Sequence, residues 1–299
     1  MMRAARHVAA TLACLLAFAA GARAADAPVR VATLLPHVED ALARMPALRV
    51  QVVASVRRSL REPVRDGVAD LGSPHAPSLE ALAAARPQLV VGDRSMHAAL
   101  AANLEPLGAE LLLLDAASVD ATFDGLLQVG ERVGAGAEMR REVDAARAAL
   151  DALVLAEPVD TLALFGTAAR WLVVTERSWL GDLLGRLRFR SVTAGAGGAE
   201  RIPGYAEVSD EQVATTRPAL VLVVTHGDPR AIRTQLDGKI GPAGAWSGVA
   251  RSARRGVHVL DPGRFTVNPG LALPDVARAL VALSNERARA ALPPAGAER

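Results

Sequence analysis

Arginine, histidine and aromatic side chains gather in the loops that follow the apolar, strand-like segments of this sequence. A guanidinium group forms charge-assisted, often bidentate hydrogen bonds with carboxylates and other oxyanions, and an aromatic ring offers a flat apolar contact. Together these residues favour binding of a small anionic ligand. Each has a structural alternative: a lone arginine is usually solvated, and a loop tryptophan can fill the core. The candidate ligand-binding residues are Arg57, Arg58, Arg94, His97, Arg170, Trp171, Trp179, His226, Arg264 and Phe265.

Sequence motifs of catalysis are absent. The chain has no Gly-x-Ser-x-Gly nucleophile elbow and no Gly-Lys-Ser/Thr phosphate loop, and its Gly-rich stretch at 195–198 lacks the rest of a dinucleotide fingerprint. Cys14 is the sole cysteine, which leaves no thiolate metal site or disulfide in the chain that follows it. We expect a protein that is not an enzyme and needs no cofactor, with a secreted hydrolase as a remote alternative.

The first 24 residues have the features of a cleavable secretory signal. A short basic start precedes an apolar run from Val8 to Ala20, and Ala22-Arg23-Ala24 offers small residues for cleavage. Cys14 lies inside the apolar run, which argues against a lipid anchor. Cleavage removes three of the 34 basic residues and none of the 32 acidic ones, so the net charge falls from +2 to about −1. This balance does not favour nucleic-acid binding. We expect a soluble periplasmic monomer.

Two stretches of the chain repeat each other. Ser78-Leu79-Glu80 leads to Arg86-Pro87 and an apolar run, and Ser209-Asp210-Glu211 leads to Arg217-Pro218 and a second apolar run, 131 residues later. In each copy the serine is a suitable N-cap, and the glutamate lies in the first turn, where the helix dipole favours negative charge. The proline then ends the helix before a buried strand. The repeat predicts two lobes with one plan.

A helix is expected between the two copies. Met139, Val143, Ala146, Leu150 and Leu153 recur at helical spacing, and charged residues occupy the other faces. It could pack on a sheet, but its position favours a rigid connection between the lobes. The expected strands are 29–34, 50–54, 89–92 and 110–114 before it, and 161–165, 172–175, 220–225 and 257–260 after it.

Alternation of strands and helices predicts an α/β fold with mostly parallel sheets. We expect two Rossmann-like lobes joined by one long helix, with a ligand cleft between them at the carboxyl ends of the strands. The boundaries that follow are a signal peptide at 1–24, an N-terminal lobe at 25–135, a connecting helix at 136–156 and a C-terminal lobe at 157–299.

The order of several motifs resembles the periplasmic binding proteins for iron–siderophore, haem and cobalamin uptake. The resemblance covers about Leu71 to Leu283. It rests on the repeated Ser-x-Glu and Arg-Pro units, Gly130-Glu131-Arg132-Val133-Gly134, the stretches 178–184 and 204–209, and Val257-His258-Val259-Leu260-Asp261 with Phe265 and Asn268-Pro269-Gly270 after it. It implies the binding component of an ABC importer, with modest lobe closure. It also implies docking to an inner-membrane permease through a glutamate on each lobe, here Glu80 and Glu211.

The sequence departs from this family in the loop after the second strand, where an aromatic step is usual. Arg57 and Arg58 stand there instead, which favours an anionic siderophore over ligands held by aromatic faces. Two alternatives stay open. Direct binding of zinc or manganese would use His37, His75, His97, His226 and Asp261, although no second histidine follows the connecting helix in the expected context. Haem would need Tyr205 or a histidine.

Overall fold

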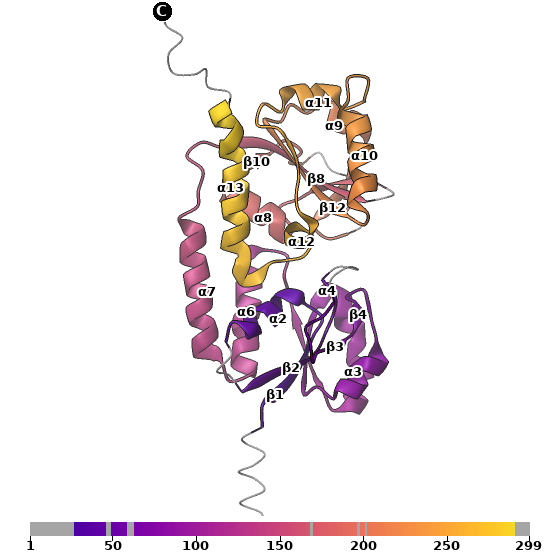
Figure 1. Cartoon of the computed structure of the whole chain (residues 1–299), viewed down its shortest axis with the longest axis vertical. Helices are drawn as coiled ribbons and strands as arrows, with labels where there is room; N and C mark the ends of the chain where they lie inside the picture. The colour runs from indigo at the N-terminus through magenta and orange to yellow at the C-terminus, as the bar shows by residue number, and fades with distance from the viewer. Residues whose placement is uncertain are drawn as a thin grey trace, which may run out of the picture.

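The computed structural model describes residues 27–45, 49–58, 63–167, 170–195, 198–200 and 202–290, and the side chains of all but the last five of these. The expected signal peptide at 1–24 lies outside the described residues. Figure 1 shows the two sheets in opposite halves of an elongated molecule, with α7 along one side.

The first sheet is five-stranded and wholly parallel. Its order is β3 (Ala69–Asp70), β2 (Val50–Ser55), β1 (Val29–Thr33), β6 (Leu89–Asp93) and β7 (Glu110–Leu114). The apolar runs predicted here as strands are all present. A short hairpin of β4 (Gly72–Ser73) and β5 (Ala76–Pro77) follows β3. The helical segments of this half are α2 (Pro36–Ala43), α3 (Leu79–Ala85), α4 (Arg94–His97), η1 (Ala98–Leu100), α5 (Ala101–Leu104), η2 (Glu105–Leu107) and α6 (Val119–Arg132).

The second sheet is six-stranded and mixed. Its order is β11 (Tyr205–Glu207), β9 (Trp171–Val174), β8 (Val159–Thr167), β12 (Leu220–His226) and β13 (Val257–Val259), and β10 (Phe189–Ser191) pairs with the start of β8. The helical segments are α8 (Trp179–Arg186), α9 (Asp210–Thr215), α10 (Pro229–Ile240), α11 (Ser247–Ser252), α12 (Pro262–Phe265), η3 (Gly270–Ala272) and α13 (Leu273–Ala290). β9 runs antiparallel to β8, since a parallel return would need a crossover far longer than the three residues that separate them.

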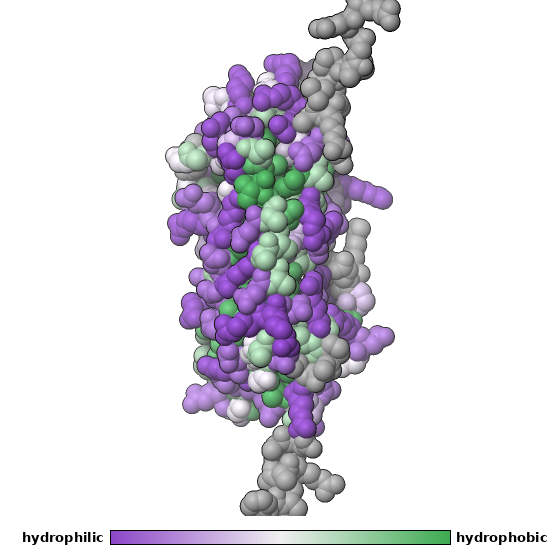
Figure 2. Space-filling view, turned by 90° about the vertical axis from the view of Figure 1, so that its left-hand side faces the viewer, coloured by the Kyte–Doolittle hydropathy of each residue, from purple (hydrophilic) through white to green (hydrophobic). Residues whose placement is uncertain are grey.

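The predicted connecting helix at 136–156 corresponds to α7 (Gly136–Asp151), which ends two residues before the last residue of the predicted stripe, Leu153. Met139, Val143, Ala146 and Leu150 are buried, as their spacing predicts. Arg140, Arg141 and Asp144 are exposed on the outer face, and Figure 2 shows this side of the molecule to be largely hydrophilic. α7 packs against α6 and α13. The exact lobe boundaries stay a prediction.

A single apolar cluster continues from one half of the molecule to the other. It includes Val31 and Phe123 of the first half, Met139 of α7, and Leu222 and Leu280 of the second half. Smaller clusters lie on the opposite face of each sheet. Because closely packed cores resist shear, this shared cluster favours small lobe movements over a wide hinge opening.

The C-terminal segment also joins the halves through polar contacts. Asn268 donates from Nδ2 to Thr122 Oγ1 (2.6 Å) and to the Ala116 carbonyl (3.3 Å). Gly270 has a φ of +56°, and a Cβ there would lie 2.8 Å from the Cβ of His37. Only glycine fits both constraints without strain. The Asn-Pro-Gly motif therefore packs the second half onto α2 and α6 of the first.

Candidate functional site

The carboxyl ends of the parallel strands in the two sheets carry several of the residues predicted to bind a ligand. β1, β2 and β6 end at Thr33, Ser55 and Asp93 in the first half, and β12 ends at His226 in the second. Figure 1 shows α4 and β4 on the side of the first half that faces the second sheet. Crevices at the carboxyl ends of strands are the usual ligand sites of open α/β sheets.

His226 of the second half lies near His75 of the first half at this site. His226 is exposed and stacks on Phe165, with ring centroids 5.7 Å apart. Partial burial lowers its pKa, and the nearby imidazole of His75, from the turn between β4 and β5, lowers that pKa further. The lowered pKa keeps the His226 ring neutral near pH 7, so that one of its nitrogens donates a hydrogen bond and the other accepts one. His75 was assigned to the metal alternative and was missing from the predicted ligand-binding set.

The arginines after β2 are paired with carboxylates. Arg57 binds Asp70 (Nε–Oδ2 2.6 Å), which holds the pKa of that carboxyl below its usual range. Arg58 binds Asp40 of α2. Arg65, which the sequence did not single out, pairs with Glu39 at 3.1 Å and with Asp40 at 3.3 Å. These contacts hold the loop onto α2 and β3, so less of the positive charge of Arg57 and Arg58 is available to an anion than the sequence indicated.

Arg94 keeps more of its charge available. It begins α4 directly after β6, its side chain is exposed, and Nη2 donates to the Leu113 carbonyl (2.9 Å). The structure gives it no carboxylate partner among the described residues. Asp93 instead caps α4 through the N–H groups of Ser95 and Met96. Of the predicted arginines in the first half, Arg94 is the one best placed to meet an anionic ligand.

His97 belongs to the interior of the first half. The side chain is 2% exposed; Nδ1 accepts from the Asp93 N–H (2.8 Å), and Nε2 lies 2.7 Å from the Pro74 carbonyl. Both nitrogens are thus engaged, with the proton on Nε2 because the Pro74 oxygen can only accept. This corrects its assignment as a ligand-binding residue: it anchors the β4–β5 turn that carries His75.

The predicted aromatic contacts are also buried. Trp171, Trp179 and Phe265 are 7%, 6% and 4% exposed and belong to apolar clusters. Trp171 packs edge-on against Trp246, with ring centroids 5.4 Å apart. Their burial corrects the prediction that they line the ligand site; loop position alone did not distinguish a core-filling ring from an exposed one.

The remaining arginines of the second half are engaged elsewhere. Arg170 pairs with Glu207 (2.8 Å) at the start of β9. Arg264 donates to the Asp275 carbonyl (3.3 Å) and lines a groove between β13 and α13. The groove is formed by second-half residues alone. The assignment of Arg264 to the ligand site between the lobes stays a prediction.

Tyr205 is poorly suited to bind haem iron. Burial raises its pKa to about 12, and its ring lies 4.6 Å from that of Phe165. A tyrosinate ligand would have to form against this burial. The histidines of the metal alternative do not converge either, since His37 and His97 are buried separately within the first half. In the described part of the chain, no three His, Cys, Asp or Glu side chains are grouped to hold a metal ion.

The two repeated glutamates are exposed at the starts of α3 and α9. Ser78 accepts from the Ala81 N–H, and Ser209 forms a capping box with Gln212, as the repeat predicts. Hydrogen bonds from the Glu211 N–H and the Ser209 hydroxyl lower the pKa of Glu211, so it is ionised at neutral pH. The serines carry out the capping, which leaves both carboxylates at the surface for another role.

Comparison with known proteins agrees with this architecture. The family model described as "Periplasmic binding protein" matches residues 35–241. The chain belongs to this family. Its members are substrate-binding proteins and not enzymes, and they serve ABC transporters. Within the described residues, no helix combines the length and apolar character needed to cross a membrane.

One curated relative and three solved structures illustrate the likeness. The chain is 27% identical over 217 residues to the Fe(3+) dicitrate-binding periplasmic protein FecB of Escherichia coli (strain K12), covering 69% of each chain. It superposes with TM-score 0.71 on an ABC transporter substrate-binding protein from Listeria monocytogenes (19% identity; 86% of this chain, 98% of the other) and on S. aureus IsdE complexed with heme (16%; 86% and 99%). Bacillus subtilis FeuA, complexed with Ferri-Bacillibactin, gives 0.67 (13%; 88% and 93%). These structures support the fold.

Proposed function

We propose that this chain is a monomeric periplasmic carrier that binds an anionic ferric chelate of the siderophore class between its lobes and delivers it to an inner-membrane ABC permease. The ligand class is supported by the likeness to a relative named for ferric dicitrate. It is also supported by the chemistry of the facing strand ends, which offer imidazole and guanidinium donors.

The observation that carries the proposal is the division between exposed polar and buried aromatic groups. Arg94 after β6, His226 at the end of β12 and His75 in the β4–β5 turn are exposed. Trp171, Trp179 and Phe265 are buried. A carboxylate- or catecholate-bearing chelate is recognised by charge-assisted hydrogen bonds, whereas cobalamin and haem rely on large flat contacts. The exposed set therefore suits an anionic chelate better.

Calorimetric titration of the purified protein with ferric citrate tests the ligand class, with a tris-catecholate ferric chelate, cobalamin, haemin and zinc chloride as comparisons. We expect a dissociation constant of about 1 μM or tighter for one ferric chelate. Arg94→Ala should weaken that binding about tenfold. Arg44→Ala, which removes an exposed arginine at the end of α2, should leave it unchanged. A Soret shift with haemin, or a micromolar zinc response without chelate binding, would reject the proposal.

We further propose that Glu80 and Glu211 dock the loaded protein onto the permease. Both are exposed in first helical turns, one in each half, and neither is needed as the N-cap of its helix. Charge pairs at the rim of an interface chiefly set the rate and orientation of association. Two such carboxylates, one on each half, would orient both lobes over the permease at once.

Transport in cells that lack the native gene tests this docking role. The double variant Glu80→Arg/Glu211→Arg should abolish uptake while the affinity of the purified protein for the chelate stays within twofold. Glu105→Arg/Glu176→Arg, which reverses two other exposed glutamates, should transport normally. Normal uptake by the first double variant would exclude the docking role, and would leave the ligand assignment intact.

A further inference from the structure

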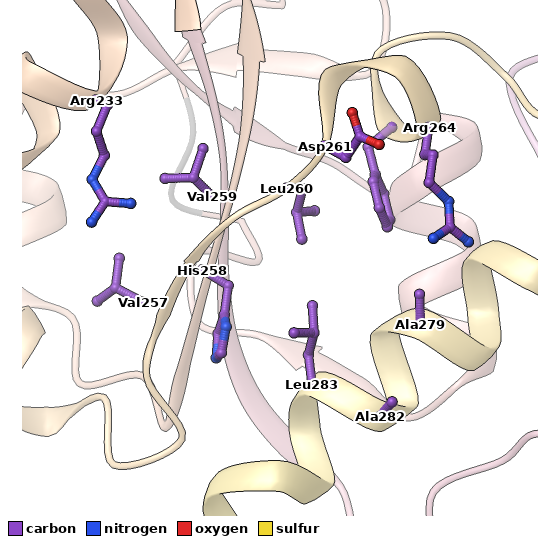
Figure 3. A pocket seen from close by; sticks show the side chains of 11 residues that line it. Arg233, Val257, His258, Val259, Leu260, Asp261, Arg264, Ala279, Ala282 and Leu283 are labelled. Carbon is purple, nitrogen blue, oxygen red and sulfur yellow. The ribbon is translucent and has the colours of Figure 1, made fainter. Parts of the chain in front are cut away.

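A groove of about 540 Å³ follows the outer edge of the second sheet, and its lining does not include Arg94, His75 or His226. β13 forms this edge, since its only neighbour in the sheet is β12. Figure 3 shows Arg233 and Arg264 on opposite sides of the groove, with His258, Leu260 and Leu283 between them. Every lining residue belongs to α10, β13, α12, α13 or the short segment between β13 and α12.

Two helices form the walls of this groove. α10 and α13 cover opposite faces of the second sheet, as Figure 1 shows, and pack into different apolar clusters. Side chains of β13 alternate between them: Val257 and Val259 pack toward the α10 side, and Leu260 toward the α13 side. The floor between the walls is therefore the backbone edge of β13 itself, in a channel open to solvent.

The register of β13 leaves this edge unpaired. Val221 donates to the Gly256 carbonyl and Leu260 donates to the Val223 carbonyl, in a parallel ladder that pairs Val221 with Val257. In such a ladder alternate residues point their backbone groups to opposite sides. The N–H and C=O groups of Val257 and Val259 thus point away from β12, into the groove. Within the described residues, no hydrogen-bond partner is recorded for them.

Charge and polarity select the kind of partner. Arg264 donates to a backbone carbonyl. Arg233 forms an ion pair with Asp237 of its own helix (Nε–Oδ1 3.0 Å), and the Arg233 side chain is more than half exposed. The Asp261 carboxylate is directed to the Gly263 N–H. Between the two guanidinium groups lie apolar side chains from both walls. An extended chain with alternating apolar and acidic residues matches both the backbone edge and the cationic sides.

We propose that this groove binds an extended, acidic peptide segment of a partner protein, which adds to β13 as a further strand. The partner's backbone would pair with Val257 and Val259, its apolar side chains would contact α13, and its carboxylates would meet Arg233 and Arg264. This contact does not use Arg94, His75 or His226, so a protein partner and a ligand between the lobes could be bound together. It does not depend on the ligand class proposed above.

A fluorescein-labelled octapeptide of alternating valine and glutamate tests the proposal against the full protein by fluorescence anisotropy. Two further probes carry lysine in place of glutamate, or the acidic sequence with alternate backbone nitrogens methylated. We expect the acidic peptide to bind, and each of the other two to bind at least about tenfold more weakly. In hydrogen exchange, the acidic peptide should slow the Val257 and Val259 amides and leave the strand ends at His226 unchanged.

Protein variants complete the test. Arg264→Glu should weaken the acidic peptide about tenfold, whereas Arg251→Glu, an equal charge reversal at an exposed position of α11, should not. The proposal would be overturned if the methylated peptide bound as tightly as the acidic peptide, or if the acidic peptide showed no binding at concentrations up to about 1 mM. Hydrogen-exchange protection confined to other strands would also overturn it. A concentration-dependent dimer that protects the same two amides without peptide would also overturn it, and would assign the groove to a second copy of this chain.

Discussion

The buried imidazole of His37 makes the stability of this protein depend on pH in a defined window. His37 is 2% exposed on α2, beneath Gly270 of the C-terminal segment. Burial lowers its pKa from 6.5 to about 4, although Asp40 opposes this shift. The unfolded chain therefore takes up a proton as the pH falls through 6.5, while the folded chain does not until about pH 4. Stability contributed by neutral His37 is full above pH 6.5 and is lost between pH 6.5 and 4.

The size of this loss follows from the pKa difference. At pH 5 the unfolded chain is 1.5 pH units below its histidine pKa, which corresponds to about 2 kcal/mol at 1.36 kcal/mol per unit. Urea unfolding at pH 8 and pH 5 should show this loss in the native protein. In His37→Gln it should be smaller by about 2 kcal/mol, because the glutamine does not titrate.

The comparison of the two proteins isolates His37 from other groups. His226 also has a lowered pKa and loses stability in the same direction on acidification, but it is present in both proteins and cancels in the difference. The absolute stability of His37→Gln does not enter the argument. A variant whose pH dependence equals that of the native protein within about 0.5 kcal/mol would refute the burial argument.

Three further substitutions test the packing around the site, each by urea unfolding. Asn268→Ala removes three hydrogen bonds and should cost about 2 kcal/mol, whereas Asn103→Ala at an exposed position should cost under about 0.5 kcal/mol. Gly181→Ala places a Cβ 1.9 Å from the oxygen of a backbone carbonyl and should lower the free energy of unfolding by about 3 kcal/mol. Gly185→Ala in the same helix has open space around the new Cβ and should raise the free energy of unfolding by up to about 1 kcal/mol. His97→Ala should cost about 3 kcal/mol and change chelate affinity only through folding; weaker binding at unchanged stability would contradict its structural role.

The hydrophobic periodicity and the helix-capping residues of the sequence predict much of the architecture. Each predicted strand has a counterpart, because runs such as Leu220 to Val224 are too apolar to lie anywhere but a buried sheet. Ser78 and Ser209 marked the starts of α3 and α9, since a serine oxygen satisfies a free N–H at a helix start. The short strands β3, β10 and β11 carry no such signal, because two or three residues are too few to show a period.

The binding residues were harder to predict, because a side chain's role depends on its neighbours in space. The sequence placed Arg57, Arg94 and His97 correctly after strands, whereas Trp171, assigned to a loop, is the first residue of β9. It could not show that Asp70 neutralises Arg57, that Pro74 and Asp93 occupy both nitrogens of His97, or that Trp171 faces the core. Each of these contacts joins residues from different segments, which no local pattern encodes.

The sequence by itself determined the family, the two-part plan and the positions of the repeated glutamates, because these follow from local periodicity, capping and motif order. Only the tertiary structure decided which candidates are exposed, that His75 lies near His226 of the other half, and that Arg264 lines a groove at β13. Burial and pairing depend on how distant segments pack together, and a loop residue's environment is set by those segments and not by its own neighbours in the chain.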